Sequence, residues 1–124
     1  MTLKTKNLKP LTILSISEIV NGKVCGTTTD LDQTIEFAFA SDLMSDVLML
    51  DANNITLITG LANPQVIRTS EMSDVKLVII GRGKKCSKEM INLAKDNNIT
   101  LIESPYSVFK ISGLLYHQGI KPIF

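Results

Sequence analysis

The sequence is poor in the residues on which most catalytic and metal centres depend. Its 124 residues include no tryptophan, one histidine (His117) and two cysteines, Cys25 and Cys86. The cysteines show neither Cys-x-x-Cys nor Cys/His spacing, which zinc sites commonly use. We therefore interpret them as reduced thiols, with a disulfide between them as the alternative, and expect no metal site and no cofactor.

An excess of charge and long apolar runs are also missing. The chain carries 13 Lys and Arg against 12 Asp and Glu, and aromatic residues make up 5%. Proteins that bind nucleic acids usually cluster basic charge or offer aromatic stacking surfaces. No segment approaches the roughly 20 apolar residues that cross a bilayer. These absences predict a cytoplasmic protein that binds neither nucleic acid nor a membrane.

What the chain does have is a large share of core-forming residues. Hydrophobic residues make up 44% of the sequence, and chains of about this length commonly form one domain with its own core. Residues 1–10 are polar and basic, so we expect them to form a flexible tail. Residues 11–124 are then expected to form the domain.

Short apolar runs alternate along the chain with amphipathic segments. Strands are predicted at residues 23–25, 35–40, 55–58, 77–80 and 100–102, with helices that begin at Ser15, Ser41, Asn63, Ser87 and Ser104. This alternation predicts an α/β fold, a single domain with a mostly parallel sheet flanked by helices. The segment 23–33 is open to a second interpretation, as an antiparallel edge or a hairpin.

The first predicted helix carries both a start and a stop signal. Ser15 and Glu18 have the spacing of a capping box, in which each side chain bonds the other's backbone N–H. Gly22 stands where a glycine commonly ends a helix in the left-handed conformation. We therefore expect a helix between Ser15 and Gly22.

The loops that follow the predicted strands should meet at one edge of the sheet, because parallel strands end together. Exposed backbone N–H groups and helix N-termini at such an edge bind anions. We predict a nucleotide or anionic metabolite site there, and the alternative is that each capping residue serves the helix alone. The candidate ligand-binding residues are Ser41, Asp42, Thr59, Gly60, Asn63, Gly81, Arg82, Gly83, Lys84 and Ser104.

The loop from Gly81 to Lys85 is the most suggestive of these, with two glycines and three cations in GRGKK. It lacks the spacing of a Walker A loop. It also departs from the dinucleotide-binding Gly-x-Gly-x-x-Gly, because Cys86 occupies the last glycine position. Solvated lysines on a tight turn are an equally good interpretation.

Three observations bear on metal binding and catalysis. Asp42 and Asp46 lie one helical turn apart and could hold a metal with Asp51, but such carboxylates more often favour a helix N-terminus. His117 falls late in the last helix, away from any predicted nucleophile. Cys86 follows two lysines at a helix N-terminus, a setting that lowers a thiol pKa, although a simple surface or semi-buried cysteine is the preferred interpretation. We predict that the protein is not an enzyme.

The last predicted helix is apolar around more than one face. Ile111, Leu114, Leu115 and Tyr116 are all apolar or aromatic, which exceeds what one core-facing stripe requires. We predict that these four residues form an interface, most simply that of a homodimer.

Three long strings, FASDLMSDVLML, LITGLANPQVIRTSEMSDVKLVIIGRGKK and IESPYSVFKISGLLYHQGI, resemble stand-alone DRTGG-domain proteins of bacteria and archaea. The resemblance runs from about Ser15 to Gly119. It implies a fold similar to the N-terminal domain of HPr kinase/phosphorylase. Related domains lie inside phosphate acetyltransferases and beside CBS domains in regulated pyrophosphatases, as regulatory and dimer-forming modules, near a nucleotide in the CBS case.

The chain departs from the family at its signature. The Asp-Arg-Thr-Gly-Gly string is absent, and the turn after Ile58 reads Thr-Gly-Leu-Ala-Asn-Pro. Contacts of that Asp-Arg pair are therefore not carried over. The residues and the resemblance together predict a non-enzymatic, ligand-sensing regulatory domain that forms a homodimer. The alternative is a protein-docking subunit without a small-molecule ligand.

Overall fold

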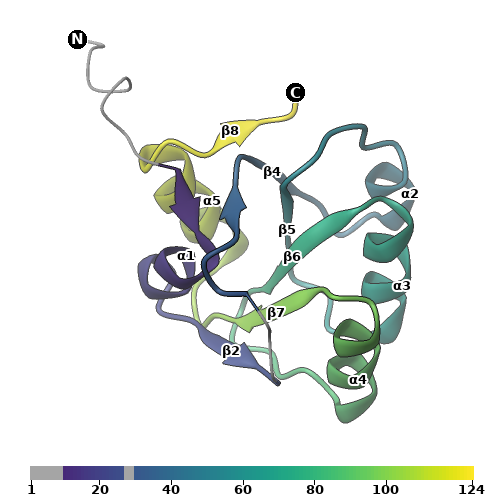
Figure 1. Ribbon diagram of the computed structural model, residues 1–124. Helices are drawn as coiled ribbons and strands as arrows, with labels where there is room; N and C mark the ends of the chain where they lie inside the picture. Colours follow the sequence, from purple (N-terminus) through teal and green to yellow (C-terminus); the bar gives the residue numbers. More distant parts are fainter. Residues whose placement is uncertain (1–9, 27–29) are drawn as a thin grey trace, which may run out of the picture.

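A computed structural model of the chain describes residues 10–26 and 30–124 (Figure 1). Apart from Pro10, the predicted tail lies outside the described residues. The strands are β1 Leu11–Thr12, β2 Lys23–Cys25, β3 Thr34–Ile35, β4 Phe37–Ala40, β5 Ile55–Thr59, β6 Val75–Ile80, β7 Thr100–Glu103 and β8 Lys121–Pro122. The helices are α1 Ile13–Ile19, α2 Met44–Val47, α3 Pro64–Met72, α4 Lys88–Asp96 and α5 Val108–His117.

Six of the strands form one sheet in the order β2-β7-β6-β5-β4-β8. Strands β4 to β7 are parallel to one another, β8 is parallel to β4, and β2 is antiparallel to β7. The predicted α/β fold with a mostly parallel sheet is confirmed, and β2 supplies the antiparallel edge. The strand predicted at residues 35–40 is divided, because β3 pairs with β1 in a separate sheet.

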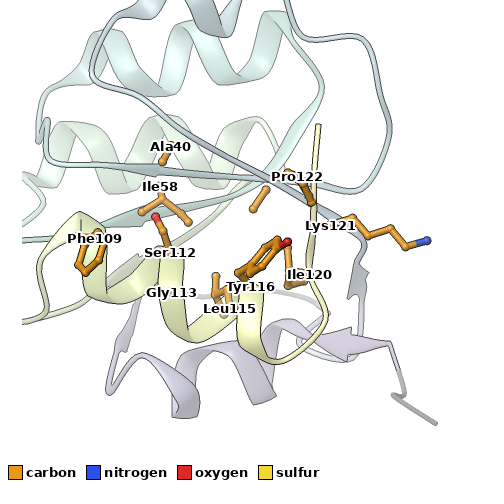
Figure 2. Close-up of a pocket in the computed structure, with 11 residues that line it drawn as sticks. Ala40, Ile58, Phe109, Ser112, Gly113, Leu115, Tyr116, Ile120, Lys121 and Pro122 are labelled. Atoms are coloured by element: carbon orange, nitrogen blue, oxygen red, sulfur yellow. The ribbon is translucent and has the colours of Figure 1, made fainter. Parts of the chain in front are cut away.

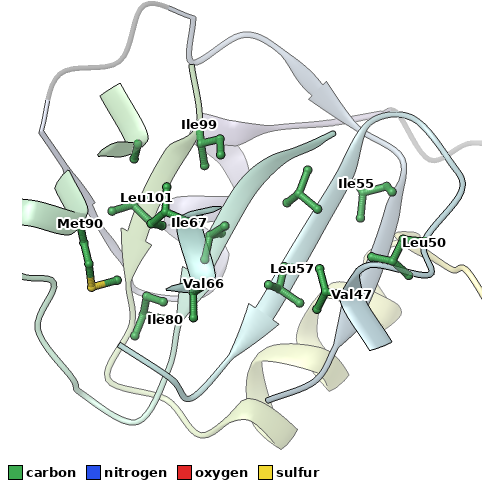
Figure 3. Packing of buried hydrophobic residues seen from close by; sticks show 13 residues of the cluster. Val47, Leu50, Ile55, Leu57, Val66, Ile67, Ile80, Met90, Ile99 and Leu101 are labelled. Carbon is green, nitrogen blue, oxygen red and sulfur yellow. The ribbon is translucent and has the colours of Figure 1, made fainter. Parts of the chain in front are cut away.

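Helices cover both faces of the six-stranded sheet. Helices α2, α3 and α4 lie on one face, and α1 and α5 lie on the other (Figure 1). Side chains alternate between the two cores. Leu57 packs toward α2 and α3 (Figure 3), whereas Ile58 packs toward α1 and α5. Strand β6 reads Val-Lys-Leu-Val-Ile-Ile because a strand covered on both faces needs apolar residues at consecutive positions.

Two helix starts agree with the sequence prediction. Asn63 caps α3 by accepting a hydrogen bond from Val66 N–H (3.2 Å), and Pro64 occupies the first turn, where a missing N–H costs nothing. Ser87 caps α4 by accepting from Met90 N–H (3.2 Å). Both caps satisfy N–H groups that would otherwise lack a partner at a helix end.

Two other helix starts were predicted wrongly. Helix α1 begins earlier, with Thr12 as its cap and Ser15 as the reciprocal partner in the capping box. Helix α5 begins later, with Ser107 as its cap in place of Ser104. In both cases a second hydroxyl residue lay three positions away, and packing of the apolar stripe selected between them.

The predicted cap at Ser41 is also wrong. Helix α2 is a short helix capped at Leu43 without a side-chain hydrogen bond. Ser41 Oγ accepts a hydrogen bond from Leu43 N–H (3.0 Å), so it shapes the turn before the helix.

The end of α1 differs from the prediction, because Asn21 and not Gly22 takes the left-handed conformation after the helix. Asn21 adopts the left-handed conformation at φ 53°, which asparagine tolerates well. Gly22 is needed for another reason, because a Cβ there would collide with the Ile102 side chain and lie 3.2 Å from Glu103 O. The glycine thus lets the backbone of α1 approach β7 closely.

No helix among the described residues is long and apolar enough to span a membrane.

The close approach at Gly22 predicts opposite outcomes for two glycine substitutions. Gly22→Ala should lower the free energy of unfolding by about 1–3 kcal/mol, because the added methyl overpacks the α1–β7 contact. Gly113→Ala in α5 should raise it by about 0.5–1 kcal/mol, because no heavy atom lies within 4 Å of its Cβ position and alanine favours the helix. Urea unfolding measures both values, and equal effects of the two variants would contradict the packing described.

Candidate functional site

Strands β6 and β7 are parallel neighbours whose connections leave the sheet toward opposite faces. Strand β6 continues into α4 on the α2–α3–α4 face, and β7 continues into α5 on the other face (Figure 1). The two connections therefore diverge at the carboxyl ends of these strands. In open α/β sheets this divergence forms a crevice in which ligands bind.

A pocket of about 400 Å³ occupies this point of divergence; we call it the basic pocket. Lys23, Lys84 and Lys85 line it together with one carboxylate, that of Glu103. Its other lining residues are Asn21, Gly22, Gly83, Ser104 and Pro105. The three ammonium groups give this part of the edge a positive charge.

Backbone N–H groups of the Gly81–Lys85 loop donate hydrogen bonds that hold the loop in place. Arg82 and Gly83 both have positive φ, at 68° and 71°, and Lys84 N–H closes the turn to Gly81 O at 3.4 Å. Arg82 N–H donates to Tyr106 O (2.7 Å), and Gly83 N–H donates to Ser104 O (3.0 Å). Because these N–H groups are occupied, an anion here would meet lysine side chains in place of the backbone amides that the sequence predicted.

Ser104 forms part of the wall of the basic pocket. Its Oγ donates to Val20 O (2.7 Å) and accepts from Tyr106 N–H (3.1 Å), and the residue is 1% exposed. The hydroxyl ties the end of α1 to the exit of β7. Ser104 therefore fixes the wall of the pocket, and its hydroxyl proton is already donated to Val20 O.

A second polar cluster lies at the ends of β4 and β5. Asp42 Oδ1 accepts hydrogen bonds from Gly60 N–H and from the Thr59 hydroxyl, both at 2.8 Å. Arg82 lies over Gly60: a Cβ there would come within 2.9 Å of the Arg82 Cδ and 3.5 Å of Asp42 Oδ2. A side chain at this position would displace the exposed arginine from its place over the turn.

The hydrogen bond from Gly60 N–H lowers the pKa of Asp42 below its ordinary value, with further contributions from Thr59, Arg82 and Lys84. Each of these contacts favours the ionised carboxylate. Asp42 therefore stabilises the turn after β5 and compensates part of the positive charge of the loop after β6.

The structure thus divides the ten predicted ligand-binding residues into three sets. Asp42, Thr59, Gly60 and Arg82 form the polar cluster, while Gly83, Lys84 and Ser104 line the basic pocket. The remaining three residues have local structural roles. Ser41 and Asn63 accept local hydrogen bonds, and Gly81 is buried against Tyr106 O and Ile111.

Sequence reasoning missed one group of side chains altogether. Cys25, Cys86 and Glu103 place their two sulfurs and a carboxylate oxygen within 4.8 Å of one another. Cys86 N–H also donates to Glu103 Oε2 at 2.7 Å. The pairing of β2 with β7 creates the group, and no local spacing in the sequence encodes it.

The thiols of this group are not activated. Burial, with the nearby Glu103, raises the pKa of Cys25 to about 11. Burial likewise raises the pKa of Cys86 far above its ordinary value, so the lysines beside it do not produce a thiolate. Burial also raises the pKa of Glu103, but the hydrogen bonds from Cys86 N–H and Cys25, together with Lys85 and Lys23, outweigh it and lower the pKa overall.

Asp42, Asp46 and Asp51 do not form a metal-ligating group among the described residues. His117 is exposed in the last turn of α5, at the opposite end of that helix from the strand exits.

The predicted interface on α5 is only partly a surface. Ile111 and Leu115 are 0% and 1% exposed and face the core. Their predicted place in an interface is therefore wrong. Leu114 is half-buried, and Tyr116 is 70% exposed. Phe109, which was not among the predicted interface residues, is 87% exposed.

Phe109 and Tyr116 border an apolar pocket of about 330 Å³ between α5 and the strands β4, β5 and β8 (Figure 2). Small side chains leave the space: Ala38 and Ala40 from β4, with Gly113 from α5. We call this the apolar pocket.

The lowered pKa of Asp42 predicts a pH-dependent contribution to stability. Asp42→Asn should lower the free energy of unfolding by about 0.5–1 kcal/mol at neutral pH, as expected for weakened hydrogen bonds at an exposed position. The contribution is complete above the unfolded-state pKa, near 3.8, and is lost as pH falls through the lower folded-state pKa.

Urea unfolding at several pH values measures this difference. Asp46→Asn serves as the control, because its exposed carboxylate accepts no hydrogen bond from the residues that the structure describes. A wild-type advantage over Asp42→Asn that persisted unchanged in strong acid would contradict the role given to the ionised carboxylate.

No protein-family model matches the chain, and no curated protein matches it. A solved structure does: the CBS and DRTGG domains of the regulatory region of Clostridium perfringens pyrophosphatase, crystallised with the activator diadenosine tetraphosphate. The TM-score is 0.70 at 21% identity, over 86% of this chain and 46% of that one, so this chain spans about half its length. The chain is thus similar in fold to a CBS/DRTGG regulatory region, which supports a DRTGG-like fold.

Proposed function

We propose that the protein is a ligand-sensing regulatory domain that binds a phosphorylated nucleotide, or a similar polyanionic metabolite, in the basic pocket. One observation supports the proposal: three lysines line the pocket that lies where the connections after β6 and β7 diverge. That place in an α/β sheet is where ligands bind. The charge of the pocket selects an anion.

The lysines are arranged to remain available to a ligand. Lys85 Nζ lies 3.7 Å from Glu103 Oε1, and its side chain is 82% exposed. An exposed ion pair of this length contributes little free energy, so Lys85 can turn toward a phosphate. Lys23 is exposed and Lys84 is half-buried beside it in the pocket lining. Ammonium groups bind phosphate as point charges and need no fixed geometry.

The fold supports the same function. The pyrophosphatase regulatory region to which the chain is similar was crystallised with diadenosine tetraphosphate, an activator that carries phosphates and adenosines. A domain of this fold can therefore belong to a nucleotide-responsive regulatory region. For the present chain we propose the same class of ligand.

We also propose that the domain is not itself catalytic. Among the described residues, the side chains around the basic pocket are lysines, one carboxylate and one buried serine hydroxyl that is already hydrogen-bonded. The thiol of Cys86 has a raised pKa, and His117 lies at the far end of α5. Regulation then follows from linkage, because a ligand that binds the folded domain stabilises it.

A second proposal concerns the apolar pocket and favours a homodimer. Phe109 and Tyr116 protrude beside a pocket on the same surface. A two-fold axis brings the same patch of two copies together, so an aromatic side chain of each copy can enter the pocket of the other. Docking of a different protein at this surface, without a small-molecule ligand, is the alternative function.

Calorimetric titration of the purified protein with ATP, and with adenosine as the comparison, tests the ligand proposal. ATP should bind and adenosine should bind far more weakly, because the pocket recognises phosphate. Lys84→Ala should raise the dissociation constant for ATP by about tenfold, or ~1.4 kcal/mol, through loss of one charged contact.

Lys95→Ala is the matched control for this titration, since Lys95 is exposed in the last turn of α4. It should leave the dissociation constant unchanged. Equal binding of ATP and adenosine, or equal weakening by the two alanine variants, would reject the basic pocket as the site.

Sedimentation equilibrium tests the dimer. The wild-type chain should sediment as a dimer. Tyr116→Glu should sediment as a monomer, because burying the new carboxylate against the apolar pocket of a second copy costs free energy. Met72→Glu on α3 is the control, since Met72 is also 70% exposed but lies on the other face of the sheet. A monomeric wild-type chain would contradict the homodimer, and a protein partner lost only in Tyr116→Glu would support the docking alternative.

A further inference from the structure

We propose that Cys25, Cys86 and Glu103 form a binding site for one thiophilic divalent cation of the Zn²⁺ class. The ligand atoms are the two Sγ atoms and a carboxylate oxygen of Glu103. This site is separate from the anion site in the basic pocket, although Glu103 borders both.

The distances fit this class of cation. All three ligand atoms lie within 4.8 Å of one another. Zinc binds sulfur at about 2.3 Å and carboxylate oxygen at about 2.0–2.2 Å, so tetrahedral angles place such ligand atoms roughly 3.5–3.8 Å apart. Small changes in side-chain torsions bring the group to that separation, and the backbone can remain where it is.

The fold holds the three residues together through long-range pairing. Lys23 pairs with Glu103 and Cys25 with Leu101 in the antiparallel ladder of β2 and β7. Since side chains two residues apart point to the same face of a strand, Cys25 and Glu103 share a face. That face is the one covered by α3 and α4, against whose core Cys25 and Cys86 pack.

Cys86 arrives from the loop before α4, and its own backbone orients the carboxylate. The Cys86 N–H donates to Glu103 Oε2 at 2.7 Å, which fixes the rotation of the carboxyl group. The Glu103 side chain is 11% exposed, and both cysteines are half-buried. A ligand so oriented loses little conformational entropy when it binds a metal.

The donor set determines which cations can bind. Two sulfurs favour soft or borderline metals such as Zn²⁺, Cd²⁺ and Co²⁺, and disfavour Mg²⁺ and Ca²⁺, which require oxygen ligands. Binding releases the two thiol protons to solvent, and the metal keeps its oxidation state. Two thiolates and a carboxylate carry three negative charges against two on the metal, and Lys23 and Lys85 lie nearby to balance the remainder.

Titration of the reduced full-length chain with Co²⁺, in the presence of a phosphine reductant, tests the proposal. One equivalent should bind and produce the thiolate-to-cobalt charge-transfer absorption, and one equivalent of Zn²⁺ should remove that absorption. Cys25→Ser and Cys86→Ser should each weaken binding by more than the roughly 10–100-fold that loss of an outer partner costs. Glu103→Gln should weaken binding while retaining the sulfur absorption.

Glu89→Gln is the matched control, because Glu89 is an exposed carboxylate on α4 outside the group. It should bind Co²⁺ as the wild-type chain does. A second measurement uses only the wild-type chain and so does not depend on a variant that folds: Zn²⁺ should protect both cysteines from N-ethylmaleimide, as counted by mass spectrometry.

Three results would overturn the site. The first is a reduced wild-type chain that binds no Co²⁺ or Zn²⁺. The second is binding that persists in both serine variants. The third is formation of a Cys25–Cys86 disulfide in air by a chain whose thiols Zn²⁺ does not protect, which would make the pair a redox couple.

Discussion

The structure depends on one constraint, the burial of both faces of a short parallel sheet. Apolar residues at consecutive positions of β5 and β6 supply two cores at once, one beneath α2, α3 and α4 and one beneath α1 and α5. Burying each large aliphatic side chain contributes roughly 1.5–3 kcal/mol. Because helices cover both faces, the chain crosses from the α1 face to the α2–α3–α4 face, and it crosses back after β7 to form α5. The basic pocket lies where the chain crosses back.

The fold was predictable from the sequence because its determinants are local. Aliphatic runs, the Asn63-Pro64 helix start and the Ser87 cap each act within a few residues. Where two hydroxyl residues competed for a cap, as at Thr12 and Ser15, propensity could not decide, since packing of the helix stripe selects between them. The interface prediction failed at Ile111 for a related reason: an apolar residue has the same signature whether it faces a core or a partner.

The sites were less predictable because they depend on strand order. That the exits of β6 and β7 form a pocket with Lys23 follows from the antiparallel addition of β2, which brings a segment near the N-terminus beside Glu103. The same pairing places Cys25 beside Cys86. No spacing in the sequence signals either grouping, and the backbone N–H groups expected to bind an anion hold the exit loop. Positive charge in the loop after β6 was the one signal of the pocket available from the sequence.

The basic pocket, at the divergence of the β6 and β7 connections, is the site where we propose that the phosphates of a nucleotide bind. The most direct test is a two-dimensional NMR titration of the isotopically labelled chain with ATP. If ATP binds in the basic pocket, the largest amide shifts should fall on residues 21–23, 83–86 and 103–104, with little change on α5 beyond its first turn. Shifts confined to the apolar pocket around Phe109 and Tyr116, or no shifts at all, would contradict it.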